Sequence, residues 1–590
     1  MKPTPPVTKG QGERILGCGL LLPLVLAAAF FLELPEVNAQ ELNQDSLDTD
    51  YYGTDASNNL VNLASLSGAT NFYSNGIYGQ NTTSWVVDEF VVSTNLFPAE
   101  NFTNLVSTYV PTGVMTNTGE HATWCAAILG AYAPPGYYLN TGMAPGTKLG
   151  SAPLATSTNT DGSFNISTNS FESYIYAASH GDVLSTSIGD SSDPSGIGTL
   201  SGLLDSLAVA DPNTTIIAAA GNNGPTNGSV GAPASGYNSI SVGALDGPTN
   251  YSVLASFSSR GPLATAWYDG TNVFYYKNGA ATRPGVDLTA PGTDIVMPVA
   301  FMVGSNSISY SYYTISGTSF ATPLVAGGAA LLDSTAKTAF SASLTNAATQ
   351  SVVVKAVLMN SADKLSGWNN GQQIASGVIT TTQALDYAMG AGRMNLNTAF
   401  TQYTSSAYVT TYPGITETGF NLPVAGTGWA YGTVLKGGKN DYTITSRLFA
   451  GEEIAVTLAW LRDQTWNNTI SDYVDVAQAE LDLMVYQVLG GGSDQLVAQS
   501  ISPVSTTQEL YFQLLSTGTY MVEVSYSTNL FDLSGTYASQ EYGLAWSVAG
   551  IPEPETLFLV VLGGIAMMFS RHHSKLCRWL KGTWHDNKRS

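Results

Sequence analysis

Cysteine is scarce in this chain. Only three cysteines occur among 590 residues, and two of them, Cys18 and Cys577, lie near the ends. If the terminal segments are removed by processing, Cys125 remains alone and no disulfide can form within the mature protein, even in an oxidising compartment. We therefore expect Cys125 to be a small buried apolar residue.

Charged residues are also few, at 11% of the chain, and the basic ones are the rarer kind. The sequence contains 21 Lys and Arg residues and 43 Asp and Glu residues, which gives a formal net charge of −22. This excess of negative charge argues against nucleic acid or an anionic membrane as a partner. The many Gly, Ser, Thr, Asn and Tyr residues favour a β-rich extracellular protein, and the length suffices for two or three domains.

The first residues have the features of an export signal. Basic residues precede an apolar run over residues 15–32, and a small-x-small sequence ends at Ala39. This pattern predicts a signal peptide over residues 1–39, cleaved after Ala39. Residues 40–67 are polar and rich in Asn, Asp and Ser, which predicts a flexible segment.

The C-terminal residues 551–590 have the features of a second targeting signal. Pro552-Glu553-Pro554 precedes apolar residues 557–569 and then several basic residues. A helix of these thirteen apolar residues would be roughly 20 Å long, which is short for a bilayer span and indicates a transient anchor. The arrangement resembles the PEP-CTERM sorting signal of Gram-negative bacteria. An ordinary C-terminal transmembrane anchor is the alternative, because the chain continues to Ser590.

The sorting-signal resemblance implies a partner and a location. The partner would be an exosortase-type processing enzyme, with membrane association through the C-terminal segment. The protein would be secreted, or held at the cell surface or in the extracellular matrix of a Gram-negative bacterium.

Strands and helices alternate between about residues 68 and 400. Residues 215–220 and 239–244 are continuous apolar runs, typical of strands that are buried on both faces. Leucines at 200, 203, 204 and 207 have the spacing of a helix that faces a core. Further strands are expected at 84–88 and 182–189, and further helices at 121–131, 171–179 and 352–362. The alternation predicts an α/β domain with a mostly parallel sheet and an active site at the carboxyl ends of its strands.

The pattern changes after about residue 400, where short strands separated by turns replace helices. Strands are expected at 454–460, 481–488, 510–515, 520–526 and 541–548. Residues 401–550 are therefore predicted to form an all-β sandwich or jelly roll. The sequences at 458–460, 481–486 and 518–520 resemble the pre-peptidase C-terminal domain of secreted proteases, which implies a packed ancillary domain.

The sequence Ser316-Gly-Thr-Ser-Phe-Ala-Thr-Pro323 presents a serine at the start of an apolar helix. Pro323 is tolerated because the early helical N–H groups have no intrahelical partner. The helix N-terminus favours negative charge developing near the Ser319 hydroxyl. A buried Gly/Ala helix with a polar cap is the simpler interpretation. The stretch resembles the serine motif of the subtilisin-like serine proteases (subtilases).

Two further motifs upstream support this resemblance. Gly119-Glu-His121-Ala122-Thr123 is similar to the subtilase histidine motif, although relatives have glycine in place of Ala122. Asp88 ends a predicted strand 33 residues before His121, a separation typical of the family. Glu89 follows it where relatives have a small residue, and is the competing carboxylate. The order Asp, His, Ser is that of subtilisin. His180, at a helix end, is interpreted as a structural cap.

The resemblance also implies the rest of an active site. Asn222, which follows an apolar strand, would donate to the oxyanion together with the Ser319 N–H group, although Asn-Asn-Gly is also an ordinary turn. The substrate pocket would be walled by Ser187, Ile188, Gly189, Ala220 and Gly221, and Ile188 suggests an apolar slot. Blocks at 142–149, 257–262, 283–292 and 390–395 resemble the family as well.

Over residues 68–400 the resemblance therefore implies a subtilisin-like three-layer α/β fold and a secreted serine endopeptidase. Asp88, His121 and Ser319 would act as a triad on protein or peptide substrates through an acyl-enzyme. No cofactor or metal is assigned, although structural calcium is common in relatives. One alternative is a catalytically silent subtilase fold that serves as a surface or matrix-binding protein. Another is an adhesin whose β-domain carries the function.

Overall fold

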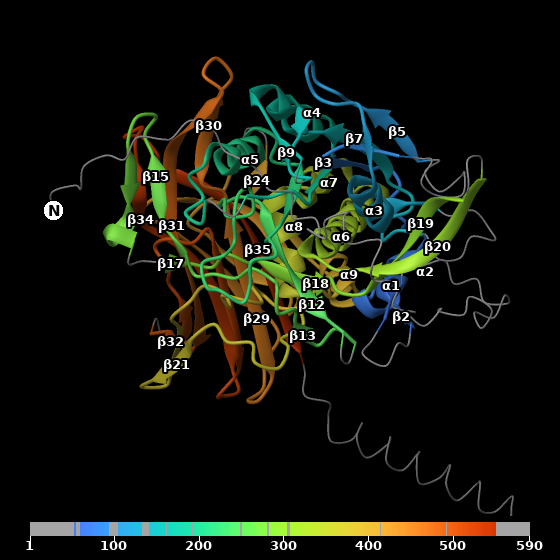
Figure 1. Ribbon diagram of the computed structural model, residues 1–590. Helices are drawn as coiled ribbons and strands as arrows, with labels where there is room; N and C mark the ends of the chain where they lie inside the picture. The colour runs from blue at the N-terminus through green and yellow to red at the C-terminus, as the bar shows by residue number, and fades with distance from the viewer. Residues whose placement is uncertain are drawn as a thin grey trace, which may run out of the picture.

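The computed structural model describes most of the chain between residues 52 and 549 (Figure 1). The described ranges are 52–54, 60–93, 104–132, 141–160, 162–190, 193–247, 250–279, 282–303, 307–412, 415–490 and 493–549. The expected signal peptide, its cleavage site and the C-terminal sorting signal lie outside these residues. Within the described residues, no helix is both long and apolar enough to cross a membrane.

A mostly parallel sheet forms the centre of the first half of the chain. Its strand order is β13-β12-β11-β10-β3-β7-β5, with β18 paired to β12. All neighbours run parallel except β12 and β13. The strands are β3 (Thr83–Asp88), β5 (Leu105–Thr108), β7 (Lys148–Pro153), β10 (Val183–Thr186), β11 (Thr215–Ala219), β12 (Ile240–Asp246), β13 (Val253–Leu254) and β18 (Leu288–Pro291). The expected α/β architecture with a mostly parallel sheet is confirmed.

Helices cover both faces of this sheet because the strand side chains alternate between two apolar clusters. Val86 points into a core with α3, α6 and α8, whereas Trp85 and Val87 point into a core with α4 and α5. The helices are α3 (Glu120–Gly130), α4 (Phe171–His180), α5 (Thr199–Ala210), α6 (Thr318–Ala339), α8 (Ser351–Asn360) and α9 (Leu396–Tyr403). The predicted helices and strands thus occur close to their expected positions.

Residues 52–67, inside the segment expected to be flexible, contain regular structure. Strands β1 (Tyr52–Thr54) and β2 (Leu60–Asn62) precede helix α1 (Leu63–Ser67). Strand β1 pairs with β19 (Ile295–Val303), which forms a hairpin with β20 (Ser307–Ile315). The polar composition did not predict this, because the pairing partner lies more than 200 residues away in the chain.

Beyond α9, the regular elements of the described chain are strands in two main sheets. One sheet has the order β23-β27-β35-β29-β33, and the other β21-β22-β32-β31-β34-β28-β26, with β30 beside β31. Their strands beyond α9 are β23 (Ala407–Val409), β26 (Asn421–Val424), β27 (Gly428–Leu435), β28 (Lys439–Ile444), β29 (Glu453–Trp460), β30 (Asp463–Asn467), β31 (Asp472–Val488), β32 (Gln495–Ser500), β33 (Thr507–Gln513), β34 (Thr519–Asp532) and β35 (Ser539–Ala549). We call the strands of these two sheets that follow α9 the β-unit.

The boundary expected at residue 400 does not separate the two sets of strands. Strands β21 (Gln372–Ala375) and β22 (Val378–Thr381) form a hairpin that precedes α9, and β22 pairs in parallel with β32 of the β-unit. Trp429 and Ala545 of the β-unit also belong to the same apolar core as α8. The two halves of the protein therefore share both a sheet and a core.

A buried ion pair lies where the β-unit meets the parallel-sheet half. Arg462 binds Asp475 through Nε and Nη2, at 2.8 and 2.7 Å, and both side chains are fully buried. The Arg462 guanidinium lies 3.9 Å from the ring centroid of Tyr237, which precedes β12. Asn238 exchanges two hydrogen bonds of 2.8 Å with the backbone of Arg462. These contacts fix the β-unit to the loop before β12.

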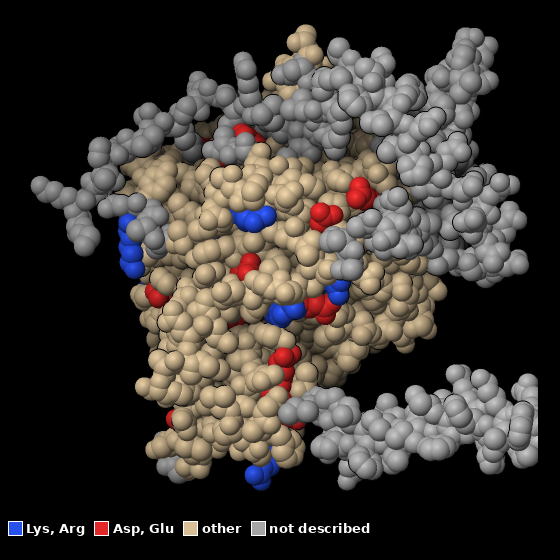
Figure 2. All heavy atoms as spheres, turned by 60° about the horizontal axis from the view of Figure 1, so that its bottom comes forward, with Lys and Arg blue, Asp and Glu red and all other residues tan. Residues whose placement is uncertain are grey.

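Charged side chains are sparse on the surface as well as in the sequence. Figure 2 shows acidic and basic side chains scattered singly or in small mixed groups among wide neutral areas on one face of the molecule. Their separation agrees with the 11% charged residues of the chain. On this face, no large patch of one sign is seen among the described residues.

Candidate active site

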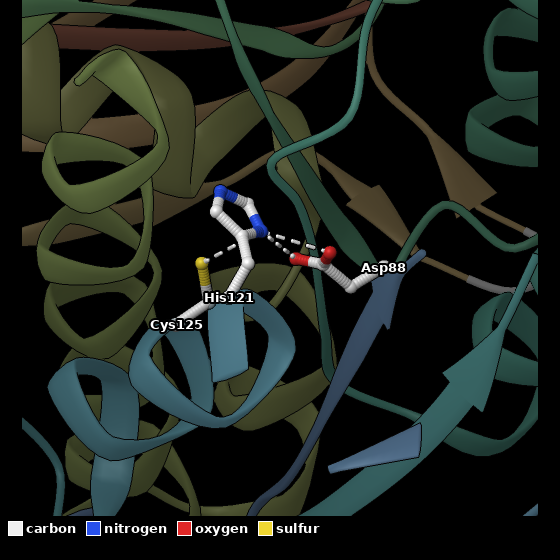
Figure 3. A group of neighbouring side chains, drawn as sticks. All are labelled: Asp88, His121 and Cys125. Atoms are coloured by element: carbon white, nitrogen blue, oxygen red, sulfur yellow. Dashed lines mark hydrogen bonds and ion pairs between the residues drawn. The ribbon is translucent and has the colours of Figure 1, made fainter. Parts of the chain in front are cut away.

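Asp88 and His121 form a buried pair at the carboxyl edge of the parallel sheet. Asp88 is the last residue of β3, and His121 is the second residue of α3. The Asp88 carboxylate lies 2.9 Å (Oδ1) and 3.2 Å (Oδ2) from His121 Nδ1 (Figure 3). The carboxylate is fully buried, and the imidazole side chain is 11% exposed. A rigid strand end thus holds the carboxylate against one ring nitrogen.

Short local hydrogen bonds fix both ends of this pair. The Glu89 N–H group donates to Asp88 Oδ1 at 2.7 Å. At the start of α3, Thr123 Oγ1 donates to the Gly119 carbonyl at 2.6 Å and accepts from the Ser93 N–H group at 2.9 Å. The histidine helix is therefore tied to the chain that follows β3, which sets the distance between the carboxylate and the ring.

The environment of His121 favours the charged imidazolium. Burial is the largest single influence and opposes the charge, but the Asp88 carboxylate and the Cys125 side chain together raise the pKa of His121 well above its ordinary value. The second ring nitrogen, Nε2, is buried and has no hydrogen-bond partner among the described residues. With Asp88 on Nδ1, the neutral ring carries its proton there and presents Nε2 as a proton acceptor.

Cys125 lies one turn after His121 on α3. Its thiol is 3.9 Å from His121 Nδ1 and donates to the Ser319 carbonyl at 3.4 Å. It is buried and free, as expected, and burial raises the pKa of the thiol. One ligand atom each of Asp88, His121 and Cys125 lies within 4.8 Å of the others, a spacing that could hold a metal ion. In this structure the Asp88 carboxylate binds His121 Nδ1, so these two residues form an ion pair with each other.

Ser319 is the second residue of α6, as the motif predicts. Its Oγ donates to the Ser187 carbonyl at 3.3 Å, and Ser187 Oγ donates to the Ser319 carbonyl at 2.8 Å. The residue is fully buried. The phenyl ring of Phe320, the next residue, lies 5.7 Å from the His121 ring. The structure thus brings the serine turn beside the histidine, with the hydroxyl directed at Ser187.

Asn222 lies just beyond the carboxyl end of β11 and contacts the start of α6. Its Oδ1 accepts hydrogen bonds from the Thr318 N–H group at 2.9 Å and from Thr318 Oγ1 at 3.0 Å. Gly221, with φ +106°, donates its N–H group to the same hydroxyl at 3.2 Å. Because the amide oxygen is occupied, the remaining function of the Asn222 side chain is to donate through Nδ2.

The five expected pocket residues follow two neighbouring strands. Ser187, Ile188 and Gly189 come after β10, and Ala220 and Gly221 come after β11. Ser187 and Gly221 contact the start of α6 through the hydrogen bonds above. Ile188 is almost fully buried in the core that contains α4 and α5. Its side chain therefore packs within this core.

The residues that depart from the family motifs are also near the pair. Glu89 is mostly buried, and burial is the main cause that raises its pKa, with His121 acting against it. Ala122 is fully buried. His180 is exposed at the end of α4, where its Nδ1 lies 2.9 Å from the Tyr176 carbonyl. The capping geometry expected for His180 is thus observed.

Two hydrogen bonds of the site were not predicted from the sequence. The hydrogen bonds of Ser187 Oγ and Cys125 Sγ to the Ser319 carbonyl join three distant segments. Only the position of Ser187 after a strand, and of Cys125 one helical turn after a histidine, could have suggested them.

The comparisons with known proteins identify the family of this chain and several of its relatives. Residues 83–392 match the model of the subtilase family, Peptidase_S8. The chain is 39% identical over 117 residues to a subtilisin of Bacillus sp. (strain TA39), which is 20% of this chain and 24% of that protein. It is 31% identical over 247 residues to a thermophilic serine proteinase of Bacillus sp. (strain AK1), which is 42% of this chain and 47% of the relative.

A solved structure is also similar, although weakly. The structure titled "Structure of Prenylagaramide maturation protease PagA" aligns with 57% of this chain and 99% of that chain, at 20% identity and a TM-score of 0.38. The chain spans less than half the length of the two Bacillus relatives. The family match covers more than half of the sequence, and the chain belongs to the subtilase family.

Proposed function

We propose that this protein is a serine endopeptidase that hydrolyses peptide bonds through Asp88, His121 and Ser319. The observation that carries the proposal is the buried Asp88–His121 pair, whose Nε2 has no partner among the described residues, at the edge where Ser319 lies in the first turn of α6. The relatives that are named as serine proteases support the same class.

The proposed reaction is acyl transfer. His121 Nε2 takes the proton of Ser319 Oγ as that oxygen attacks the peptide carbonyl. Asp88 keeps the other ring nitrogen protonated and stabilises the imidazolium that forms. The oxyanion receives hydrogen bonds from Asn222 Nδ2 and the Ser319 N–H group. His121 then protonates the leaving amine, and water hydrolyses the acyl-enzyme by the same steps.

One hydrogen bond of Ser319 is exchanged in this reaction. The Ser319 hydroxyl donates to the Ser187 carbonyl at 3.3 Å, a long bond that is easily exchanged. In the proposed reaction, Oγ exchanges this bond for one to His121 Nε2. Catalytic hydrogen bonds are often loose without substrate and tighten in its complex.

We further propose a secreted or surface-held protein with protein or peptide substrates. The support is the N-terminal export pattern and the Pro-Glu-Pro segment followed by apolar residues 557–569, which would be processed by an exosortase-type enzyme. The β-unit, with its two packed sheets, would be an ancillary jelly-roll domain. No cofactor enters the proposed reaction.

The second candidate is a silent subtilase fold that binds a surface or matrix. It is favoured by Glu89, a partly buried acid beside the pair, and by the hydrogen bond that the Ser319 hydroxyl donates to the Ser187 carbonyl. In such a protein the serine would remain unreactive.

A fluorophosphonate probe distinguishes the two candidates. We expect it to label the wild-type protein and not the Ser319→Ala variant, while Ser316→Ala, three residues away, still labels. The matched serine controls for nonspecific reaction. A folded wild-type protein that takes up no probe would contradict the endopeptidase and favour the silent fold.

A further inference from the structure

Three large apolar side chains are exposed at one end of the β-unit. Phe449 is 54% exposed, Leu489 56% and Leu515 65%. Phe449 lies between β28 and β29, Leu489 follows β31, and Leu515 lies between β33 and β34. We call these three residues the apolar tip. They project from three separate turns, and more than half of each side chain is left to solvent.

The strand pairing places the three turns side by side. Leu448, next to Phe449, forms a bridge with Gly518. Val488, next to Leu489, pairs with Thr519, the residue after Gly518.

The third turn joins the same group. The Gly451 N–H group donates to the Leu514 carbonyl at 2.7 Å, which connects the turn of Phe449 to that of Leu515. The apolar tip is therefore one surface, although its members are up to 66 residues apart in the chain.

The last described strand ends at the same place. Glu453, four residues after Phe449, pairs with Gln513 of β33 on one side and with Ala549 of β35 on the other. The chain therefore leaves the β-unit beside the apolar tip. Leu557, the first residue of the apolar run 557–569, is eight residues beyond Ala549. Even fully extended, eight residues span at most about 28 Å.

We propose that the apolar tip rests on the lipid surface that receives residues 557–569. This inference depends on the proposed sorting signal, whose residues 557–569 would associate with a membrane before any processing, and not on the peptidase activity. Because the connection is short, an inserted segment would hold the tip at a high effective concentration near the bilayer. Phe and Leu side chains would then leave water by entering the boundary between headgroups and acyl chains.

The charge of the protein selects the kind of lipid. A chain of net charge −22 is repelled by an anionic surface, so the contact must come from the apolar side chains. Neutral, zwitterionic lipid is therefore the favoured partner. Other possible occupants of the tip are a second copy of the chain or the segment 557–569 itself folded back, and the experiment separates them from lipid.

The test is a spin-label accessibility measurement on the full chain in phosphatidylcholine vesicles. Cys18→Ser and Cys577→Ser leave only the buried Cys125, and Ser319→Ala prevents self-digestion. One sample carries the label at Leu515→Cys. The matched control carries it at Ile470→Cys, which is 60% exposed in the turn between β30 and β31, at the opposite end of the β-unit (Figure 1).

We expect the label at 515 to become about tenfold less accessible to a water-soluble nickel chelate when vesicles are added, and more accessible to oxygen. The label at 470 should not change. Phe449→Ser with Leu489→Ser should restore access of the chelate at 515 without a change in melting temperature, because Leu515 is already replaced by the labelled cysteine and none of the three apolar side chains then remains.

Three results would overturn the proposal. The first is equal chelate access at both positions in vesicles that retain the protein. The second is protection at 515 before lipid is added, which would mean that a second copy or the chain's own segment covers the tip. The third is a full chain that stays in the aqueous fraction. None of these bears on peptidase activity, which the fluorophosphonate probe measures separately on the wild-type protein.

Discussion

Two of the buried ion pairs in the described residues can be compared directly, and only one of the two has the chemistry of a reaction. Asp88–His121 lies at the carboxyl edge of the parallel sheet, and Arg462–Asp475 lies where the β-unit meets that half. Both carboxylates are fully buried. His121 Nε2 and Arg462 Nη1 are each without a partner among the described residues. A neutral imidazole nitrogen can accept a proton, whereas a guanidinium nitrogen cannot.

The comparison teaches that burial of a charge does not by itself mark an active site. The guanidinium stacks on Tyr237 and donates to Asp475 and the Ala266 carbonyl, so most of its surface is used in packing. The imidazole instead keeps a basic nitrogen beside the first turn of α6. Mutations in the two pairs should therefore affect different quantities.

The largest expected effect is at the nucleophile. Ser319→Ala should lower the turnover of a peptide substrate by roughly a millionfold, because no oxygen remains to form the acyl-enzyme. Hydrolysis of a peptide p-nitroanilide measures this, and an unchanged circular dichroism melt controls for folding. Residual activity above 1% of wild type would mean that Ser319 is not the nucleophile.

Breaking the other pair should affect stability first. Arg462→Met leaves the Asp475 carboxylate buried without its partner, which should cost about 3–5 kcal/mol of the free energy of unfolding. Urea denaturation of the purified protein measures the loss. Arg462→Met combined with Asp475→Leu should recover most of it, because both charges are then absent. An equally unstable double variant would show that packing on Tyr237 dominates instead.

The oxyanion donor should have a smaller effect on turnover. Asn222→Ala should lower kcat by about a hundred- to a thousandfold with little change in KM, since the donor acts mainly in the transition state. Steady-state kinetics separate the two constants. Asn223→Ala is the neighbouring control and should stay within about threefold of wild type. Similar losses for both variants would point to a disturbed turn.

The smallest expected effect is a shift of the pH profile. His121 must be neutral to accept a proton, and its raised pKa places the acid limb of kcat/KM above pH 6.5. In Asp88→Asn the carboxylate is absent and the pKa of His121 falls. The acid limb of the remaining kcat/KM should therefore move to lower pH by roughly one to three units. A pH titration of kcat/KM measures both limbs.

The same ionisation affects the free energy of unfolding with a defined sign. Because the pKa of His121 is raised in the folded state, the Asp88–His121 pair contributes stability that is full below pH about 6.5. This contribution is lost as the pH rises through the raised value. If the pH profiles of kcat/KM were identical for wild type and Asp88→Asn, Asp88 would not be the residue that raises the pKa of His121.

Much of the parallel-sheet half was predictable because its signals are local. The apolar run at 215–220 became β11 (Thr215–Ala219), and the serine motif became the first turn of α6. The expected helix at 171–179 became α4. Each of these elements depends on periodicity or a turn within a few residues. The proximity of Asp88, His121 and Ser319 could be inferred only from their family resemblance.

Long-range partners could not be predicted from the sequence. The hairpin of β21 and β22 joins a strand more than 100 residues later, and no local pattern names that strand. Arg462 and Asp475 are both charged residues that composition would place at the surface. The hydrogen bond from the Ser319 hydroxyl to the Ser187 carbonyl depends on the side-chain rotamer of Ser319. That rotamer is set by the tertiary packing and not by the local sequence.

The hairpin of β21 and β22 restricts how this protein can be cut and recombined. A fragment that ends at residue 400 would keep the hairpin but lose its neighbour β32, and so present an open strand edge that invites aggregation. A fragment that begins at 401 would lack two strands of its larger sheet. A chimaera that grafts the β-unit onto another protease would therefore need residues 372–381 as well. The two halves of this chain cannot be exchanged by cutting it at a single linker.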